Sequence, residues 1–189
     1  MRIVPTAIPE VKLVETVVHR DGRGFFVETW RADAFAAAGI AATFVQDNHS
    51  RSVRGTLRGL HAQLARPQGK LIRVVAGEIL DVAVDIRRGS PTFLRHVAVT
   101  LSSEDARSMW VPVGFAHGFC VLSETADVAY KCTDVYDADD ELRIRYDDPR
   151  LGIDWPIVDP LVSEKDRVAL PVDAVYERLP AFRASPSRR

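Results

Sequence analysis

Short runs of β-branched and apolar residues, interrupted by glycine, proline or aspartate, make up most of this chain. Such runs are typical of strands, and the interrupting residues are typical of turns. Short strands at this spacing predict an all-β sandwich or barrel. The strands predicted in the middle and later parts of the chain span residues 71–75, 78–86, 95–101, 108–113, 117–122, 127–133 and 141–146.

The ends of the chain carry the few other elements. Residues 11–18 and 25–30 flank a turn-forming segment at 20–24 and predict a hairpin. An alanine-rich stretch at 33–38 predicts a helix that Gly39 closes in the left-handed conformation. A second short helix is predicted near 163–167, with Ser163 as its cap. From about residue 151 we expect the chain to wrap over the barrel, and we expect the polar residues 183–189 to fray.

Length and charge exclude several classes of protein. The 189 residues, 47% of them hydrophobic, suffice for one sizeable core but are few for two domains. A net charge of −1 gives no basic field that would attract nucleic acid or acidic membranes. No apolar run is long enough to span a bilayer, and the N-terminus lacks a signal-peptide pattern. Because Cys120 and Cys132 lie in apolar runs, we expect an intracellular protein with two reduced core thiols.

A dense set of polar residues lies within one strand-like run. Residues 57–63 read Leu-Arg-Gly-Leu-His-Ala-Gln, and Lys70 follows shortly afterwards. Such a set predicts the inside of a pocket, and histidine is the side chain best suited to moving protons near neutral pH. In a regular strand Arg58 and His61 would face opposite sides. Either Gly59 marks a bulge that brings both to one side, or one of the two assignments is wrong.

Residues 111–119 contain a P-x-G-x-x-H pattern that ends at His117. The pattern resembles the second motif of the cupins, small double-sheet jelly-roll barrels. In metal-binding cupins this histidine is one ligand, and an earlier H-x-H and a glutamate supply the others. Here the earlier segment has only His61, followed by Ala62 and Gln63, so a three-histidine site cannot be built and we expect no metal. Recruitment of His49 or Asp47 stays open, as does a plain core role for His117.

A series of further motifs, in order along residues 11–170, resembles the dTDP-4-dehydrorhamnose 3,5-epimerase family. Each motif alone is weak, but this many in the expected order is a specific signal. The matching segments are 21–28 (DGRGFFVE), 44–50 (FVQDNHS), 57–61 (LRGLH), 68–70 (QGK), 77–87, 90–93, 112–119, 130–134 (YKCTD) and 148–156.

This resemblance implies a cupin-like double-sheet jelly roll with short peripheral helices, formed as one domain by residues 1–189. It implies epimerisation of dTDP-4-dehydro-6-deoxy-D-glucose at C3 and C5 to dTDP-4-dehydro-L-rhamnose, without metal or organic cofactor. By motif match His61 is the base, Asp166 orients it, and Tyr130 is the acid on the opposite ring face. Lys70 would stand near the 4-keto oxygen. The family also implies a cytoplasmic homodimer without nucleic-acid or membrane partners.

The same resemblance assigns a set of substrate-binding residues. Arg23 lies on a segment that commonly reaches into a neighbouring subunit. Phe26 and Tyr136 are candidates for stacking on the thymine ring, although a core role is favoured for Phe26. Gln46 and Asn48 have the same strand parity and are expected to face one cavity. The full set is Arg23, Phe26, Glu28, Gln46, Asn48, Arg58, His117, Tyr136, Glu141 and Lys165.

Several readings compete with a two-position epimerase. Ala62 stands where the family often has an aromatic residue, which leaves open a single-position epimerase of a modified deoxysugar pathway. A metal-dependent cupin oxygenase is disfavoured by the missing H-x-H. A non-catalytic module that binds sugar nucleotides is disfavoured because both His61 and Tyr130 are present.

Overall fold

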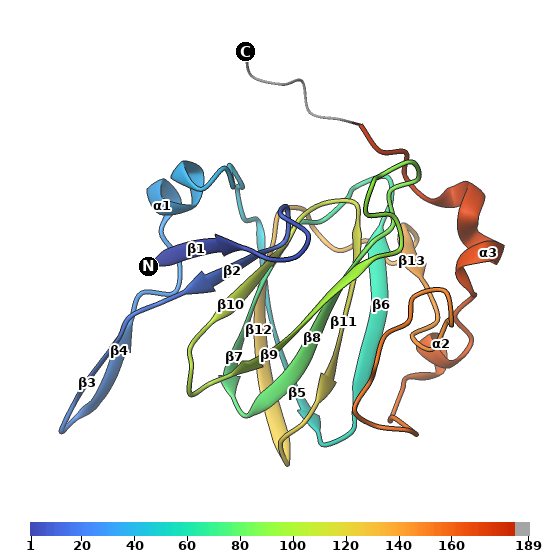
Figure 1. Ribbon diagram of the computed structural model, residues 1–189. Coiled ribbons are helices and arrows are strands. Elements are labelled where there is room, and N and C mark those ends of the chain that lie inside the picture. The colour runs from blue at the N-terminus through green and yellow to red at the C-terminus, as the bar shows by residue number, and fades with distance from the viewer. Residues whose placement is uncertain (184–189) are drawn as a thin grey trace.

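The computed structural model describes residues 1–183, so all but the first residue of the tail expected to fray lie outside the described residues. Two antiparallel sheets face each other in a double-sheet jelly roll, as the cupin-like pattern predicted (Figure 1). The six-stranded sheet has the order β1 (Arg2–Pro5), β2 (Lys12–Glu15), β10 (Ser108–Val111), β7 (Lys70–Ala76), β12 (Thr125–Cys132) and β5 (Gln46–Val53). The five-stranded sheet has the order β13 (Glu141–Arg143), β6 (Leu57–Gln63), β11 (Phe115–Val121), β8 (Glu78–Asp85) and β9 (His96–Ser102).

The core lies between the two sheets. Ile72 and Val128 from the six-stranded sheet pack with Ile79, Phe115 and other apolar side chains of the five-stranded sheet. Because side chains alternate across a strand, the same strands present a second set of residues to the outside. The side chains that point inward line the space between the sheets, and some of these side chains are polar.

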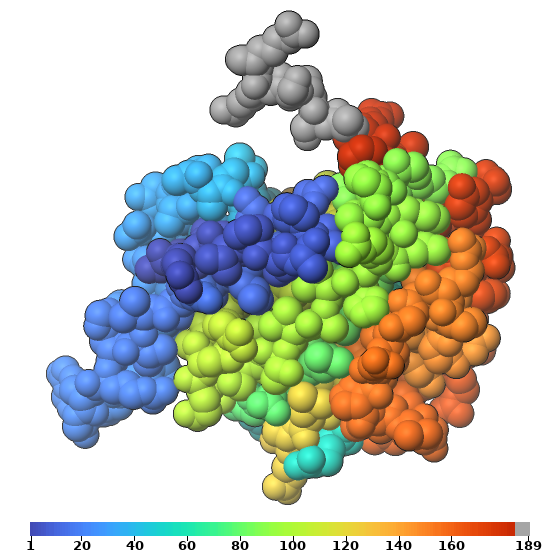
Figure 2. Space-filling model, viewed as in Figure 1, coloured from blue at the N-terminus to red at the C-terminus, as the bar shows by residue number. Residues whose placement is uncertain are grey.

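The C-terminal segment covers the outer face of the five-stranded sheet. It contains α2 (Glu164–Arg167), α3 (Val172–Val175) and the short helix η1 (Tyr176–Arg178). Leu151 and Leu179 pack with outward-facing residues such as Leu60 and Val84. The orange and red residues in Figure 2 lie along this side of the molecule. The predicted wrap over the barrel is thus confirmed.

The two predicted helices are also confirmed, and a hairpin forms around the predicted turn from strands that are shorter than predicted. Helix α1 (Ala32–Ala37) is followed by Gly39 with φ +79°. At α2 the Ser163 hydroxyl accepts a hydrogen bond from the Asp166 amide at 3.1 Å. The hairpin pairs β3 (Val18–Asp21) with β4 (Gly24–Val27) and projects from the body of the molecule (Figures 1 and 2). Among the described residues no helix is long and apolar enough to cross a membrane.

Several strands differ from the prediction. The run at 11–18 is divided between β2 and β3, because the chain leaves the six-stranded sheet near Thr16, whose hydroxyl donates to the Ala106 carbonyl at 2.8 Å. The predicted strand 141–146 ends at residue 143, although Ile144 still exchanges backbone hydrogen bonds with Leu60. Strand β1 was not predicted from the sequence. Cys120 and Cys132 are buried free thiols, as expected.

A bulge in β6 resolves the question of strand parity. His61 lies opposite His117, and Arg58 lies opposite Phe119, so β6 carries one more residue than β11 over this interval. The extra residue brings Arg58 and His61 to the same side of the sheet. Gly59 has φ +120°, and a Cβ there would lie 2.6 Å from the Gly118 Cα. The bulge therefore requires glycine at position 59.

Replacing Gly59 with alanine should destabilise the protein by roughly 3 kcal/mol or more, because backbone strain and a backbone clash combine. Gly89 is a matched control, since it has φ +82° but no atom within 4 Å of the point that a Cβ would occupy. Gly89→Ala should cost only about 1 kcal/mol from its left-handed conformation. Urea unfolding of both variants measures the difference, and equal losses would show that the close approach of the two strands does not matter.

Candidate active site

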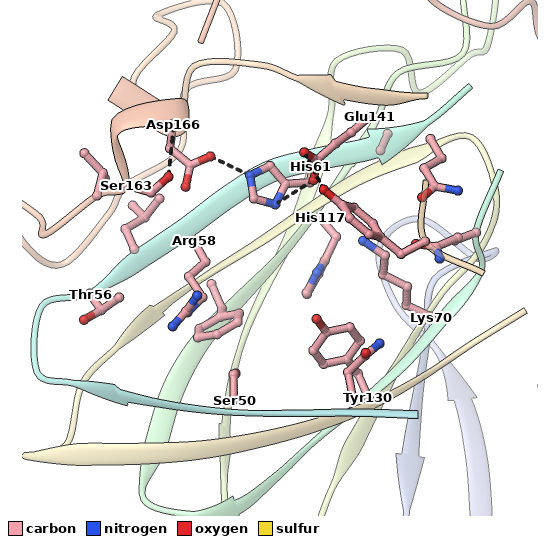
Figure 3. A pocket seen from close by; sticks show the side chains of 18 of the residues that line it. Ser50, Thr56, Arg58, His61, Lys70, His117, Tyr130, Glu141, Ser163 and Asp166 are labelled. Carbon is pink, nitrogen blue, oxygen red and sulfur yellow. Dashed lines mark hydrogen bonds and ion pairs between the residues drawn. The ribbon is translucent and has the colours of Figure 1, made fainter. Parts of the chain in front are cut away.

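A cavity of about 570 Å³ opens between the sheets, a volume suited to a small molecule (Figure 3). Strands of both sheets line it, together with the segment that leads into α2. Ten of the site residues expected from the sequence line this one cavity: Gln46, Asn48, Arg58, His61, Lys70, His117, Tyr130, Tyr136, Glu141 and Asp166.

His61 and Asp166 form a hydrogen-bonded pair on one wall of the cavity. The Nε2 atom of His61 lies 2.5 Å from Oδ1 of the buried Asp166. Burial acts to raise the pKa of Asp166, but hydrogen bonds from His61, Ser163 and the Gly59 amide outweigh it, and the pKa lies below its usual value. An ionised Asp166 accepts the Nε2 proton and leaves Nδ1 of His61 as the basic nitrogen. Nδ1 faces the cavity, where it lies 3.8 Å from Oε1 of Glu141.

Tyr130 and Lys70 approach the cavity from the opposite sheet. Both belong to the six-stranded sheet, on β12 and β7, whereas His61 belongs to the five-stranded sheet (Figure 3). Burial raises the pKa of Tyr130, so the phenol stays protonated and can act as an acid. Burial lowers the pKa of Lys70, while nearby Cys132, Glu141 and Asp81 act in the other direction. A molecule held between the sheets would therefore meet a base on one face and an acid on the other.

A chain of amide hydrogen bonds lines another part of the cavity. The Tyr136 amide donates to Gln46 Oε1 at 2.7 Å, and Gln46 Nε2 donates to Asn48 Oδ1 at 3.0 Å. Asn48 Nδ2 in turn contacts the Cys132 sulfur at 3.6 Å. Gln46 and Asn48 face the same cavity, as their parity predicted. On the bulged strand, Arg58 Nε donates to the Ser52 hydroxyl at 3.1 Å.

His117 has a carboxylate partner that the sequence did not reveal. Its Nε2 atom lies 2.7 Å from Oδ1 of Asp81, a buried residue on β8. The other oxygen of Asp81 has no hydrogen-bond partner among residues 1–183. An aspartate at an inward position within the apolar stretch 79–84 of β8 was the available signal. Ser50 and Gln63, which also line the cavity, follow Asn48 and His61 by two residues and share their parity.

Four expected site residues lie outside this cavity: Arg23, Phe26, Glu28 and Lys165. Arg23 and Phe26 belong to the projecting hairpin, where Arg23 pairs with Asp21 at 2.6 Å. The Phe26 side chain is 70% exposed, so the favoured core role is wrong for this residue. The physical reason is that the hairpin extends away from both sheets and offers no interior to fill (Figure 1).

The alternative metal ligands also lie outside the cavity. His49 Nε2 is 3.0 Å from Asp127 Oδ1, and Asp47 pairs with the Lys131 ammonium at 2.6 Å. Within the part of the chain that the structure describes, no group of three or more histidine, cysteine, aspartate or glutamate side chains is arranged to hold a metal ion.

The family model for dTDP-4-dehydrorhamnose 3,5-epimerase matches residues 5–173. The chain belongs to this family. The dTDP-4-dehydrorhamnose 3,5-epimerase of Pseudomonas aeruginosa is 56% identical over 169 residues, which cover 88% of this chain and 93% of that protein. The epimerase of Neisseria gonorrhoeae is 53% identical over 167 residues, which cover 88% of this chain. The match covers 51% of the Neisseria protein, so this chain spans about half of that relative's length.

Solved structures of the epimerase family have the same fold. The dTDP-6-deoxy-D-glucose-3,5-epimerase of Legionella pneumophila, solved in complex with dTDP-4-keto-L-rhamnose, superposes with a TM-score of 0.94. It is 50% identical in sequence, and the match covers 97% of this chain and 99% of that chain. The cupin-like epimerase fold expected from the motifs is therefore confirmed.

Asp166→Asn should lower the free energy of unfolding at neutral pH by roughly 1–3 kcal/mol, because it removes the charged partner of His61. The pKa of Asp166 is lower in the folded protein than its unfolded value of about 3.9. Ionised Asp166 therefore stabilises the folded protein fully when the pH is above the unfolded pKa, and this stabilisation is lost as the pH falls through the lower pKa of the folded state.

Urea unfolding of wild type and Asp166→Asn at about pH 7 and about pH 3 tests this linkage. The difference should be larger at neutral pH and should shrink in acid. Asp154→Asn, which changes an exposed carboxylate of the same C-terminal segment, is the control. A difference that stays constant over this range would mean that ionised Asp166 does not stabilise the fold.

Proposed function

We propose that this chain epimerises dTDP-4-dehydro-6-deoxy-D-glucose at C3 and C5 to dTDP-4-dehydro-L-rhamnose, without a cofactor. Membership of the epimerase family supports the reaction. The observation that carries the proposal is the placement of His61, hydrogen-bonded to Asp166 of α2, on one sheet and of Tyr130 on the other. Inversion at carbon needs a base and an acid on opposite faces of the sugar ring, and these two groups supply them.

The chemistry follows from the acidity of the hydrogens beside the ketone. Nδ1 of His61 removes the proton, and the electron pair of the C–H bond moves to the 4-keto oxygen to form an enolate. The Lys70 ammonium stabilises the developing oxyanion, a contact whose loss costs roughly 2.7–4 kcal/mol. The Tyr130 hydroxyl then returns a proton to the opposite face of the carbon, and the enolate reverts to the ketone. Asp166 stabilises the imidazolium that forms in the first step.

The remaining polar residues would bind the nucleotide. We propose that Arg58 pairs with the diphosphate, because a guanidinium matches phosphate oxygens. Gln46 and Asn48 are proposed to bind the base or sugar, and Tyr136 to stack on the thymine ring. His117 and Glu141 complete the proposed contacts inside the cavity. Lys165 lies outside the cavity, next to Asp166 on α2, and is proposed to contact the substrate at the cavity's edge. Arg23, Phe26 and Glu28 need another explanation, since they lie outside the cavity.

We propose that a second copy of the chain supplies those three residues. The hairpin projects from the body and exposes Phe25 and Phe26, an apolar surface that a homodimer would cover. In such a dimer the single jelly-roll domain of each subunit would lend its Arg23 to the diphosphate in the partner's cavity. The buried free thiols Cys120 and Cys132 fit a reducing compartment, and we propose that the enzyme acts in the cytoplasm.

In deuterated water the enzyme and the keto sugar nucleotide should exchange deuterium into both C3 and C5, and NMR or mass spectrometry follows the label. His61→Ala should abolish exchange at both carbons. Tyr130→Phe should retain part of the exchange but lose epimerised product, because abstraction precedes reprotonation.

The outcomes separate the competing functions. Label at one carbon alone would identify a single-position epimerase. Absence of label with the wild-type enzyme would rule out epimerisation and leave a binding module or an oxygenase. Full epimerisation by Tyr130→Phe would remove Tyr130 from the mechanism.

Mixing two inactive variants tests the shared site. His61→Ala lacks the base but keeps its own hairpin, and Arg23→Ala lacks the hairpin guanidinium but keeps its base. After joint refolding, half of the dimers are mixed and each has one intact site, so about a quarter of wild-type activity should return. Sedimentation equilibrium gives the subunit number. No recovery of activity in a sample that contains mixed dimers would show that Arg23 does not act across the interface.

A further inference from the structure

The side-chain amide of Gln63 joins two loops at the edge of the cavity. Its Nε2 atom donates to the Arg66 carbonyl at 2.8 Å and to the Val135 carbonyl at 3.2 Å. Its Oε1 atom accepts from the Asp137 amide at 2.8 Å. Both amide hydrogens and the carbonyl oxygen are thus used, and the residue is only 7% exposed. A buried side chain with all these partners holds its surroundings in one arrangement.

The segment held by Gln63 is the Tyr136 loop, defined here as residues 133–139. Val135 and Asp137, the two partners in this loop, flank Tyr136 on either side. The Tyr136 side chain lines the cavity and is 49% exposed, so apolar burial contributes little to fixing its ring. Its hydroxyl donates to Glu141 at 3.3 Å, a long hydrogen bond. The position of the ring therefore depends on how its backbone is anchored.

The Gln46 and Gln68 side chains also hold this loop, at the Tyr136 amide and the Asp134 carbonyl, but Gln63 belongs to the strand that carries His61. Gln63 follows His61 by two residues on β6 and faces the same side of the sheet. Strand β6 pairs with β11 and β13, so its backbone is rigid. The Gln63 amide thus sets the distance between the loop that carries Tyr136 and the imidazole of His61.

We propose that Gln63 is a positioning residue that holds Tyr136 in place to stack on the base of the nucleotide. This inference rests on the proposed function, in which Tyr136 stacks on thymine while His61 acts on the sugar. The groups proposed to contact the nucleotide and the sugar ends of the substrate are thus tied to one strand.

Two variants of Gln63 test the inference. Gln63→Leu removes all three hydrogen bonds, and Gln63→Glu keeps the shape but turns a carboxylate oxygen toward the Arg66 and Val135 carbonyls. Both should raise KM for the sugar nucleotide by roughly five- to twentyfold, a large part of the stacking contribution of one base. The kcat value should change by less than about twofold, because the nucleobase that Tyr136 would stack on lies far from the reacting carbons of the sugar.

Arg66→Ala is the matched control on the same pair of loops. It removes an exposed ion pair with Asp134 but leaves the Arg66 carbonyl that Gln63 contacts. Such exposed ion pairs contribute little to stability, so the loop should keep its position and KM should stay near that of the wild type.

A double-mutant cycle tests whether Gln63 acts through Tyr136. In a Tyr136→Ala background, Gln63→Leu should cause no further rise in KM.

Hydrogen exchange of the free protein tests the anchor without any ligand. Amides 134–139 should exchange faster in both Gln63 variants than in the wild type and in Arg66→Ala. Unchanged exchange, a kcat loss at constant KM, or effects of Gln63→Leu and Tyr136→Ala that add independently would each overturn the inference. Failure of the proposed function looks different, since the wild-type enzyme itself would then give no deuterium label in the sugar.

Discussion

The site depends on one extra residue in β6. Three residues of β11 (117–119) lie opposite four of β6 (58–61), and Gly59 passes so close to Gly118 that no Cβ fits between them. In a regular strand the Arg58 guanidinium or the His61 imidazole would point outward into the apolar layer around Leu142 and Val175. A buried cation without a partner is strongly unfavourable there. The bulge avoids this cost and brings the Arg58 guanidinium and the His61 imidazole into one cavity.

Burial shifts the pKa values of the proposed acid, Tyr130, and of the proposed oxyanion-binding group, Lys70, in opposite directions. Removal from water raises the pKa of Tyr130 and lowers that of Lys70, because it disfavours the charged form of each. For Tyr130 the shift keeps the proton that the proposed reprotonation would use. For Lys70 the shift works against the positive charge that the proposed enolate would need, and nearby Cys132, Glu141 and Asp81 oppose the shift. The Glu141 carboxylate therefore has an electrostatic reason to line this cavity, because it favours the charged form of Lys70.

Local patterns in the sequence predicted local structure well. Strands β7 and β8 follow from apolar runs broken at Gly77, and α2 follows from Ser163 as a cap. Parity placed Gln46 and Asn48 on one face. Other features depend on partners far along the chain and gave no local signal. The sequence around Asp81 does not indicate that His117 is its hydrogen-bond partner. The sequence around Phe26 favours a core residue, because it does not show that the hairpin projects from the body. The site roles that rest on the family resemblance stay predictions.

Strand β6 connects the parts of the site that lie far apart in sequence. At its start, Leu57 donates to the Leu161 carbonyl at 2.9 Å, and Leu161 donates back to Gly55 at 2.8 Å. This pairing fixes the segment that leads into α2, and so it places Asp166 against His61 although 105 residues separate the two. At its end, Gln63 holds the Tyr136 loop. A disturbance of β6 should therefore affect His61, its carboxylate partner and the proposed nucleotide contacts together. His61 belongs to this strand, and Asp166 and the Tyr136 loop are hydrogen-bonded to side chains of the strand.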